Sequence, residues 1–183
     1  MANVSSRTAN WRLLGGGGLI LGGVIWTLNV ILAQAGIGAL GQWPFVIALL
    51  IVAVALVLVA FGETGSNGAV GDWLLGKVAL IVYAAGFLLL AVNAAAALGA
   101  AVVSIAAILV IVGGLVSAYA IYQKGVAKGA ARWFLFLPAV VGALWAIGAA
   151  FVASLSIWWL GLALALLLAI TGVLYLFNSR KLG

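Results

Sequence analysis

Few residues of this chain carry side chains that could do chemistry. The sequence contains no cysteine and no histidine, and its only acidic residues are Glu63 and Asp72. Disulfides and thiol catalysis are therefore excluded, and the commonest general base and the usual ligands of haem and transition metals are missing. Two carboxylates alone cannot build most hydrolytic or metal sites. We expect no catalytic residue, no metal site and no cofactor, and we expect that the protein is not an enzyme.

Three polar residues at the ends of long apolar stretches could line a path for a solute. They are Asn29, Asn93 and Ser104. Buried polar groups inside a membrane often mark such a path. However, an asparagine near a helix end also caps backbone groups, and a helical serine bonds back to the carbonyl one turn earlier. The sequence leaves both interpretations open.

The run of four glycines from Gly15 to Gly18 has the flexibility of a phosphate-binding loop but not its context. Such a loop follows a strand and closes with Gly-Lys-Ser/Thr, and neither feature is present here. We expect these glycines to serve close helix packing instead.

The elements that carry these residues are predicted from composition. The chain of 183 residues is 68% hydrophobic and 5% charged, with a mean hydropathy of +1.42. A soluble domain carries about 25% charged residues, so lipid is the solvent that this composition fits. The strict alternation of a membrane β-barrel is absent. We predict an all-α fold, a single polytopic bundle of six transmembrane helices within residues 1–183. The predicted helices cover residues 13–35, 43–61, 73–92, 100–123, 133–152 and 157–177.

Charge predicts the orientation of this bundle. All eight basic residues lie on one side of the predicted topology, together with both acids, and the loops of the other side carry no charge. By the positive-inside rule both termini lie in the cytoplasm, and the membrane is the plasma or inner membrane of a cell. The net charge of +6 is spread thinly between apolar runs, so we expect no nucleic-acid partner. The basic residues are Arg7, Arg12, Lys77, Lys124, Lys128, Arg132, Arg180 and Lys181.

Small residues recur along the odd-numbered helices at spacings of three and four, which place them on one helix face. In lipid, such faces allow two backbones to approach closely. We predict that these residues lie at helix–helix contacts. The candidates are Gly15, Gly18, Gly22, Gly76, Ala79, Gly86, Gly142 and Ala146.

Trp11, Trp73 and Trp133 are 62 and 60 residues apart and open the three odd-numbered helices. Three pseudo-repeated helical hairpins explain this spacing, and so does the ordinary aromatic belt of a six-helix membrane protein. The other tryptophans are expected near the outer interface, except Trp145, which is expected nearer mid-membrane. Those expected near the outer interface are Trp26, Trp43, Trp158 and Trp159.

Six short helices, three hairpins, very short loops and glycine-rich odd helices resemble the HdeD-like small membrane proteins, a family linked to acid and stress resistance in bacteria. The pattern covers residues 11–177, and Trp43-Pro44 matches the proline with which that family opens an even-numbered helix. Ala100 and Ile157 open their helices without one. The resemblance implies a six-helix fold and carries no functional residue over.

Two functions from different classes follow from these observations. The first is a non-enzymatic membrane protein that acts through helix packing, as an accessory or assembly subunit of a complex or as a small stress-related protein. Its partners would be the lipid bilayer and other membrane subunits or copies of itself. The alternative is a passive channel or transporter for a small neutral or apolar solute, formed by a homo-oligomer. The Ala- and Gly-rich composition is typical of a bacterium with a GC-rich genome.

Overall fold

The computed structural model describes residues 11–37, 41–61, 68–151 and 158–177 of the chain. Every regular element in these ranges is helical, and six helices are long and apolar enough to cross a membrane. The predicted all-α class of a multi-pass membrane protein is therefore confirmed. The elements are a π-helical turn, Trp11–Gly16, followed by α1 (Gly17–Gln34), α2 (Trp43–Phe61), α3 (Leu74–Ala96), α4 (Ala100–Lys124), α5 (Ala130–Trp133), α6 (Phe136–Phe151) and α7 (Trp158–Phe177). The predicted cytoplasmic positions Arg7, Glu63, Arg180 and Lys181 lie outside the described residues.

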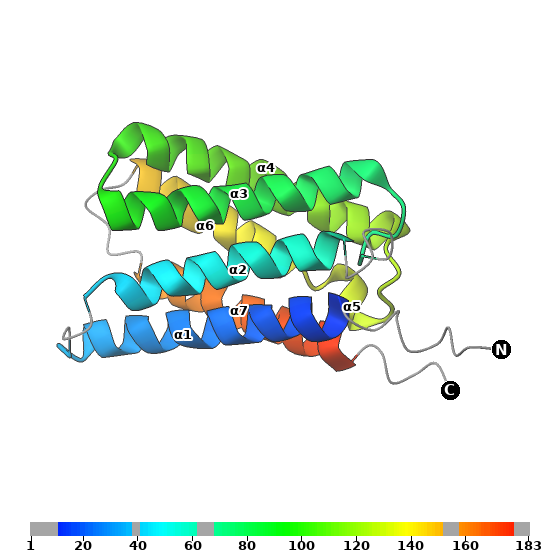
Figure 1. Ribbon diagram of the computed structural model, residues 1–183, viewed down its shortest axis with the longest axis horizontal. Helices are drawn as coiled ribbons and strands as arrows, with labels where there is room; N and C mark the ends of the chain where they lie inside the picture. Colours follow the sequence, from blue (N-terminus) through cyan, green and yellow to red (C-terminus); the bar gives the residue numbers. More distant parts are fainter. Residues whose placement is uncertain (1–10, 38–40, 62–67, 152–157, 178–183) are drawn as a thin grey trace.

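The six long helices form a closed ring in the order of the sequence. Helix α1 packs on α2, α2 on α3, α3 on α4, α4 on α6 and α6 on α7, and α7 returns to α1. The start of α1 and the end of α7 lie at the same end of the ring (Figure 1), so each helix runs antiparallel to its two neighbours. Helices α1 and α4 thus lie on opposite sides of the ring.

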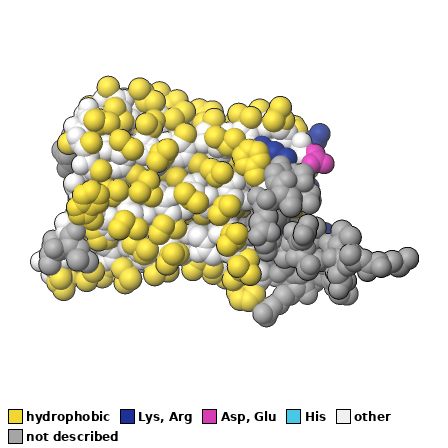
Figure 2. All heavy atoms as spheres, in the orientation of Figure 1, with side chains coloured by type: hydrophobic (Ala, Val, Ile, Leu, Met, Phe, Trp, Pro, Cys, Tyr) yellow, Lys and Arg dark blue, Asp and Glu magenta, His cyan; other side chains and the backbone are white. Residues whose placement is uncertain are grey.

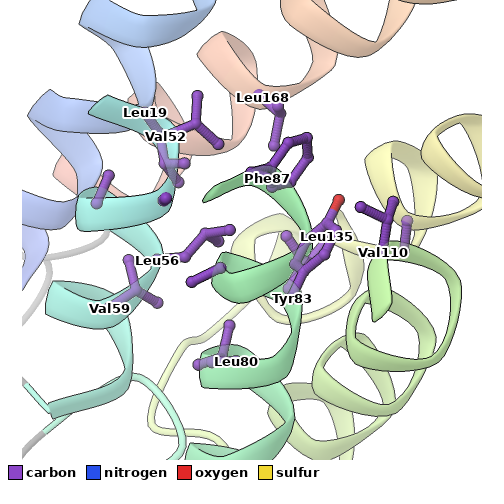
Figure 3. Close-up of a cluster of buried hydrophobic side chains, with 14 of the residues drawn as sticks. Leu19, Val52, Leu56, Val59, Leu80, Tyr83, Phe87, Val110, Leu135 and Leu168 are labelled. Carbon is purple, nitrogen blue, oxygen red and sulfur yellow. The ribbon is translucent and has the colours of Figure 1, made fainter. Parts of the chain in front are cut away.

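Large side chains fill the centre of the ring. Leu56 of α2, Phe87 of α3 and Leu168 of α7 are fully buried and converge there (Figure 3). Lipid tails are as apolar as leucine, so burial alone does not drive these helices together, and close van der Waals packing has to hold the ring.

The charged residues of the described chain lie at one end of the bundle, which we call the charged end. Figure 2 shows basic and acidic side chains at the end of the molecule where α1 begins and α7 ends, and hydrophobic side chains along the rest of the described part of the visible face. Charged side chains are expensive in hydrocarbon, so this end has to meet the aqueous interface. The described members are Arg12, Asp72, Lys77, Lys124, Lys128 and Arg132.

The three largest departures from the predicted helix boundaries each have a local reason, and the other boundaries agree to within one residue. Helix α3 continues to Ala96, four residues beyond the predicted end, and stops where Ala97 takes a left-handed conformation with φ of 51°. The first span opens with the π-helical turn, whose last two residues belong to the glycine run. The fifth span is divided into α5 and α6, so that Pro138 lies in the first turn of α6, where its missing N–H costs nothing.

Candidate functional site

Two of the three polar residues that could line a solute path make local hydrogen bonds. The Asn93 side-chain oxygen accepts the backbone N–H of Gly99 at 3.0 Å and so holds the turn between α3 and α4. The Ser104 hydroxyl donates to the Ala100 carbonyl of its own helix at 3.0 Å. Asn29 lines a pocket of about 210 Å³ with apolar neighbours such as Ile25 on α1, the helix on the opposite side of the ring from α4.

Deeper hydroxyl groups are also engaged locally. Ser117 donates to the Gly114 carbonyl at 3.0 Å, and Thr171 donates to the Leu167 carbonyl at 2.7 Å. Such bonds within a helix satisfy the hydroxyl without offering it to a passing solute. Among the described residues, the hydroxyls of Thr27 and Tyr83 are buried without a hydrogen-bond partner.

The predicted small-residue face of α1 lies against α2. A Cβ added at Gly15 would lie 2.7 Å from Cγ2 of Val59, and one added at Gly18 would lie 2.8 Å from the Cβ of Ala55. At Gly22 the added atom would lie 2.7 Å from Cγ2 of Val52. Distances this short do not occur between real side chains, so glycine sets the separation of the two helices.

The second hairpin repeats the outer contact of the first. A Cβ added at Gly86 would lie 2.7 Å from Cγ2 of Val110 and 3.1 Å from the Ala106 carbonyl oxygen. Gly22 makes the same two contacts at the same distances, with a valine and with the carbonyl of an alanine four residues before it. The α1–α2 and α3–α4 hairpins therefore share one packing register at this point.

The third hairpin departs from this arrangement. Its predicted packing residue Gly142 makes only ordinary contacts, with an added Cβ 3.5 Å from Leu164 and 3.6 Å from the Tyr83 hydroxyl. Trp145 lies between α6 and α7 instead, and a Cβ added at Gly161 would lie 3.2 Å from its Nε1. At this contact the glycine of α7 therefore faces an indole ring and not the backbone of the neighbouring helix.

The remaining predicted packing residues are buried. Ala79 and Ala146 are 5% and 2% exposed, and an added Cβ at Gly76 would lie 2.9 Å from Val70, a residue of the loop before α3. The small-residue faces are thus used largely within the chain itself. They leave the outward side of each helix for any other partner.

Sequence reasoning missed a second small-residue face on α1, directed at α7. A Cβ added at Gly23 would lie 2.6 Å from the Ala165 carbonyl oxygen, and Gly16 and Gly172 pack backbone against backbone. The sequence signal for this face was the spacing of seven residues, or two helical turns, from Gly16 to Gly23. The prominent three-and-four spacing of the first face obscured it.

Contacts between loops and helix ends organise the charged end. The Ala69 N–H donates to the Val59 carbonyl at 2.8 Å, and the Ala69 carbonyl accepts the Val126 N–H at 2.9 Å. These bonds join the end of α2 to the loop that follows α4. Arg132 donates from Nε to the Tyr122 carbonyl at 2.6 Å, and its guanidinium lies 5.3 Å from the centre of the Tyr122 ring.

Two outward-facing grooves run beside α2. The groove between α1 and α2 has a volume of about 250 Å³, and the groove between α2 and α3 has about 330 Å³. They share Leu50, Val54 and Leu58, which form the ridge between them. Both grooves are apolar throughout, as expected of a surface that faces lipid.

The sequence matches no protein-family model, and neither the curated proteins nor the solved structures contain a match to it.

Proposed function

We propose that this protein is a non-enzymatic membrane protein that acts through its outward surface. It serves as an accessory or assembly subunit of a larger complex in a bacterial inner membrane, or as a small stress-related membrane protein. The observation that carries the proposal is the filled centre of the ring, where Leu56, Phe87 and Leu168 are fully buried. A protein whose interior is packed in this way has its outward face left for interaction.

The stress-related role rests on the resemblance to the HdeD-like proteins, whose six short helices and small loops this chain shares. The subunit role rests on the packing. Because the small-residue faces are used within the chain, a partner would meet the larger aliphatic residues on the outside of the helices, as in a ridge-in-groove contact.

The alternative, a passive path for a small neutral or apolar solute, has weaker support. The hydroxyls of Ser117 and Thr171 donate to their own helices, and Asn93 holds a turn. A path within one copy would need such groups to be aligned and available. A path between copies of the chain would remain compatible with this packing.

Cross-linking in native membranes, followed by purification in mild detergent, tests the subunit proposal. The chain has no cysteine, so single cysteines can be placed at will. We expect that a cysteine on the outward side of at least one helix cross-links to a second protein. Ile108→Cys, at a position that is 59% exposed, is one such variant. The buried position Val110→Cys on the same helix is the matched control.

A second protein recovered in fixed stoichiometry would support the subunit role. A homo-oligomer as the sole product would favour self-association and the passive path. A chain that stays monomeric in detergent and cross-links at no outward position of the six long helices would contradict the proposal.

A further inference from the structure

The groove between α2 and α3 has a defined floor, two rims and an end. Ala53 and Ala84 form its floor and are 6% and 4% exposed, whereas the rim residues Val54, Ile81 and Leu88 are 60%, 39% and 46% exposed. Small floor residues between larger rims make a trough of about 330 Å³ that is open to the surroundings. This volume lies in the range of small-ligand sites.

A cation lies on the line of this trough at the charged end. On α3, Lys77 precedes the lining residues Ile81, Ala84 and Leu88 at steps of four, seven and eleven, so all four share one helix face. On α2, Phe61 follows Val57, Val54 and Leu50 at the same steps. The next residue on each wall of the trough is therefore Lys77 on one side and Phe61 on the other.

These two residues meet across the trough. The Lys77 ammonium lies 6.0 Å from the centre of the Phe61 ring, at the limit of a cation–π contact. Lys77 is 9% exposed, so protein covers most of its side chain. This placement differs from that of Lys124, an exposed residue at the same end whose ammonium lies 5.3 Å from the Trp73 ring.

The length of the trough matches one leaflet of a bilayer. From Lys77 to Leu88 the helix rises about 16 Å, since each residue adds 1.5 Å. The hydrocarbon core of a bilayer is about 30 Å thick. A chain that lies along the trough with its polar end beside Lys77 would thus reach the middle of the membrane.

We propose that the α2–α3 trough binds an anionic phospholipid of the leaflet at the charged end, with an acyl chain along Ala53 and Ala84 and its phosphate beside the Lys77 ammonium. Charge complementarity identifies the occupant, because the wall is apolar along its length and cationic at its end. The inference does not depend on the proposed subunit role.

The test uses the full chain in nanodiscs that contain equal amounts of phosphatidylglycerol and phosphatidylcholine. After release into detergent, native mass spectrometry counts the lipids retained on the protein. We expect phosphatidylglycerol to be retained about fivefold over phosphatidylcholine, the factor that corresponds to the contribution of one basic residue beside an anionic lipid. Lys77→Gln should bring the two lipids to parity, and Lys77→Arg should keep the preference.

Lys124→Gln is the matched control, because it removes the same charge from the same end of the bundle but not from the trough. Ala85→Phe keeps the charge and fills the trough, so it should lower the retention of both lipids. Val112→Phe, at a position 51% exposed on α4, should not. Ala85→Phe also keeps the proposal testable if Lys77→Gln proves unstable.

Equal retention of the two lipids by the unaltered protein would overturn the proposal. So would an equal loss of preference in Lys77→Gln and Lys124→Gln, which would show a diffuse surface field instead of a site. Cross-linking of two copies through Val57→Cys would show that a second copy of the chain covers the trough.

Discussion

Gly22 of α1 and Val52 of α2 lie in direct contact at the point where the two helices approach closely. A Cβ added at Gly22 would lie 2.7 Å from Cγ2 of Val52 and 3.1 Å from the Ala48 carbonyl oxygen. Valine holds one side-chain rotamer in a helix, so Val52 has little freedom to turn away. We expect Gly22→Ala to lower the free energy of unfolding by about 1–3 kcal/mol, the cost of overpacking a tight contact.

Thermal unfolding in detergent measures this effect, and Gly17→Ala is its matched control. Gly17 lies five residues earlier on the same helix, and no atom lies within 4 Å of a Cβ added there. Alanine is the better helix former, so Gly17→Ala should leave the melting temperature unchanged or raise it. Equal melting temperatures for the two variants would show that the α1–α2 contact does not depend on glycine.

Gly18 and Ala55 predict a rescue. A Cβ added at Gly18 would lie 2.8 Å from the Cβ of Ala55, so Gly18→Ala should destabilise the hairpin, and Ala55→Gly should restore the missing space. The second hairpin already has its glycine on the other helix. In the shared register, Gly18 and Ala55 correspond to Val82 and Gly113, and Gly113 packs on the backbone of Val82 and Tyr83.

A double-mutant cycle measures the coupling as the difference between the double variant and the sum of the single variants. We expect 0.5–3 kcal/mol of favourable coupling, as is usual for residues in contact. Strictly additive losses in unfolding free energy would mean that the two positions do not share the space between α1 and α2.

The fold class could be predicted because composition alone decides it, whereas the inward side of each helix could be read only from its glycines. In a soluble protein, the inward face of a helix is apolar and its outward face is polar. In lipid both faces are apolar, so this difference between them is lost. Val54 and Leu56 of α2 are both large and apolar, yet one is 60% exposed and the other fully buried. Gly15, Gly18 and Gly22 carried the positional signal because the need for close approach is independent of solvent.

Trp26 shows what the sequence did not predict. The aromatic-belt rule gave it a depth near the outer interface but not its burial, and the side chain is 1% exposed. Its ring lies 5.4 Å from Phe45 and 5.4 Å from Trp145, and 6.3 Å from Phe87. Aromatic side chains of α1, α2, α3 and α6 therefore meet inside the bundle. Aromatic pairs in such edge-to-face arrangements add to the stabilisation that burial of the rings gives.

This placement predicts a large cost for Trp26→Ala. Removing a buried aromatic side chain leaves a cavity and costs about 3–5 kcal/mol. Trp159→Ala is the control, because Trp159 is 56% exposed and should cost far less. Melting temperatures in the same detergent compare the two variants. If Trp159→Ala proved as destabilising as Trp26→Ala, the aromatic cluster would not be what holds the four helices together.

The proposed orientation predicts which ends of the helices a reagent can reach. Ala130 and Ala95 are both exposed, one at the charged end and one at the other. With the positive charges inside the cell, a membrane-impermeant thiol reagent should label Ala95→Cys in intact cells and should label Ala130→Cys only after the cells are opened. Labelling of Ala130→Cys in intact cells would reverse the topology.

We expect that a single chain does not carry out transport coupled to protons or ions. Coupling needs a group that binds and releases charge within the membrane. The acidic and basic residues that the structure describes, among them Asp72, Lys77 and Arg132, all lie at the charged end. The deeper hydroxyls of Ser117 and Thr171 donate to backbone carbonyls. We therefore expect purified protein in liposomes to give no solute-dependent proton movement under an imposed pH gradient.

Protein-free liposomes are the control for leakage. Solute uptake driven by the gradient would show that a coupling group exists, and Tyr83→Phe would then be the first variant to examine, because the buried Tyr83 hydroxyl has no hydrogen-bond partner among the described residues.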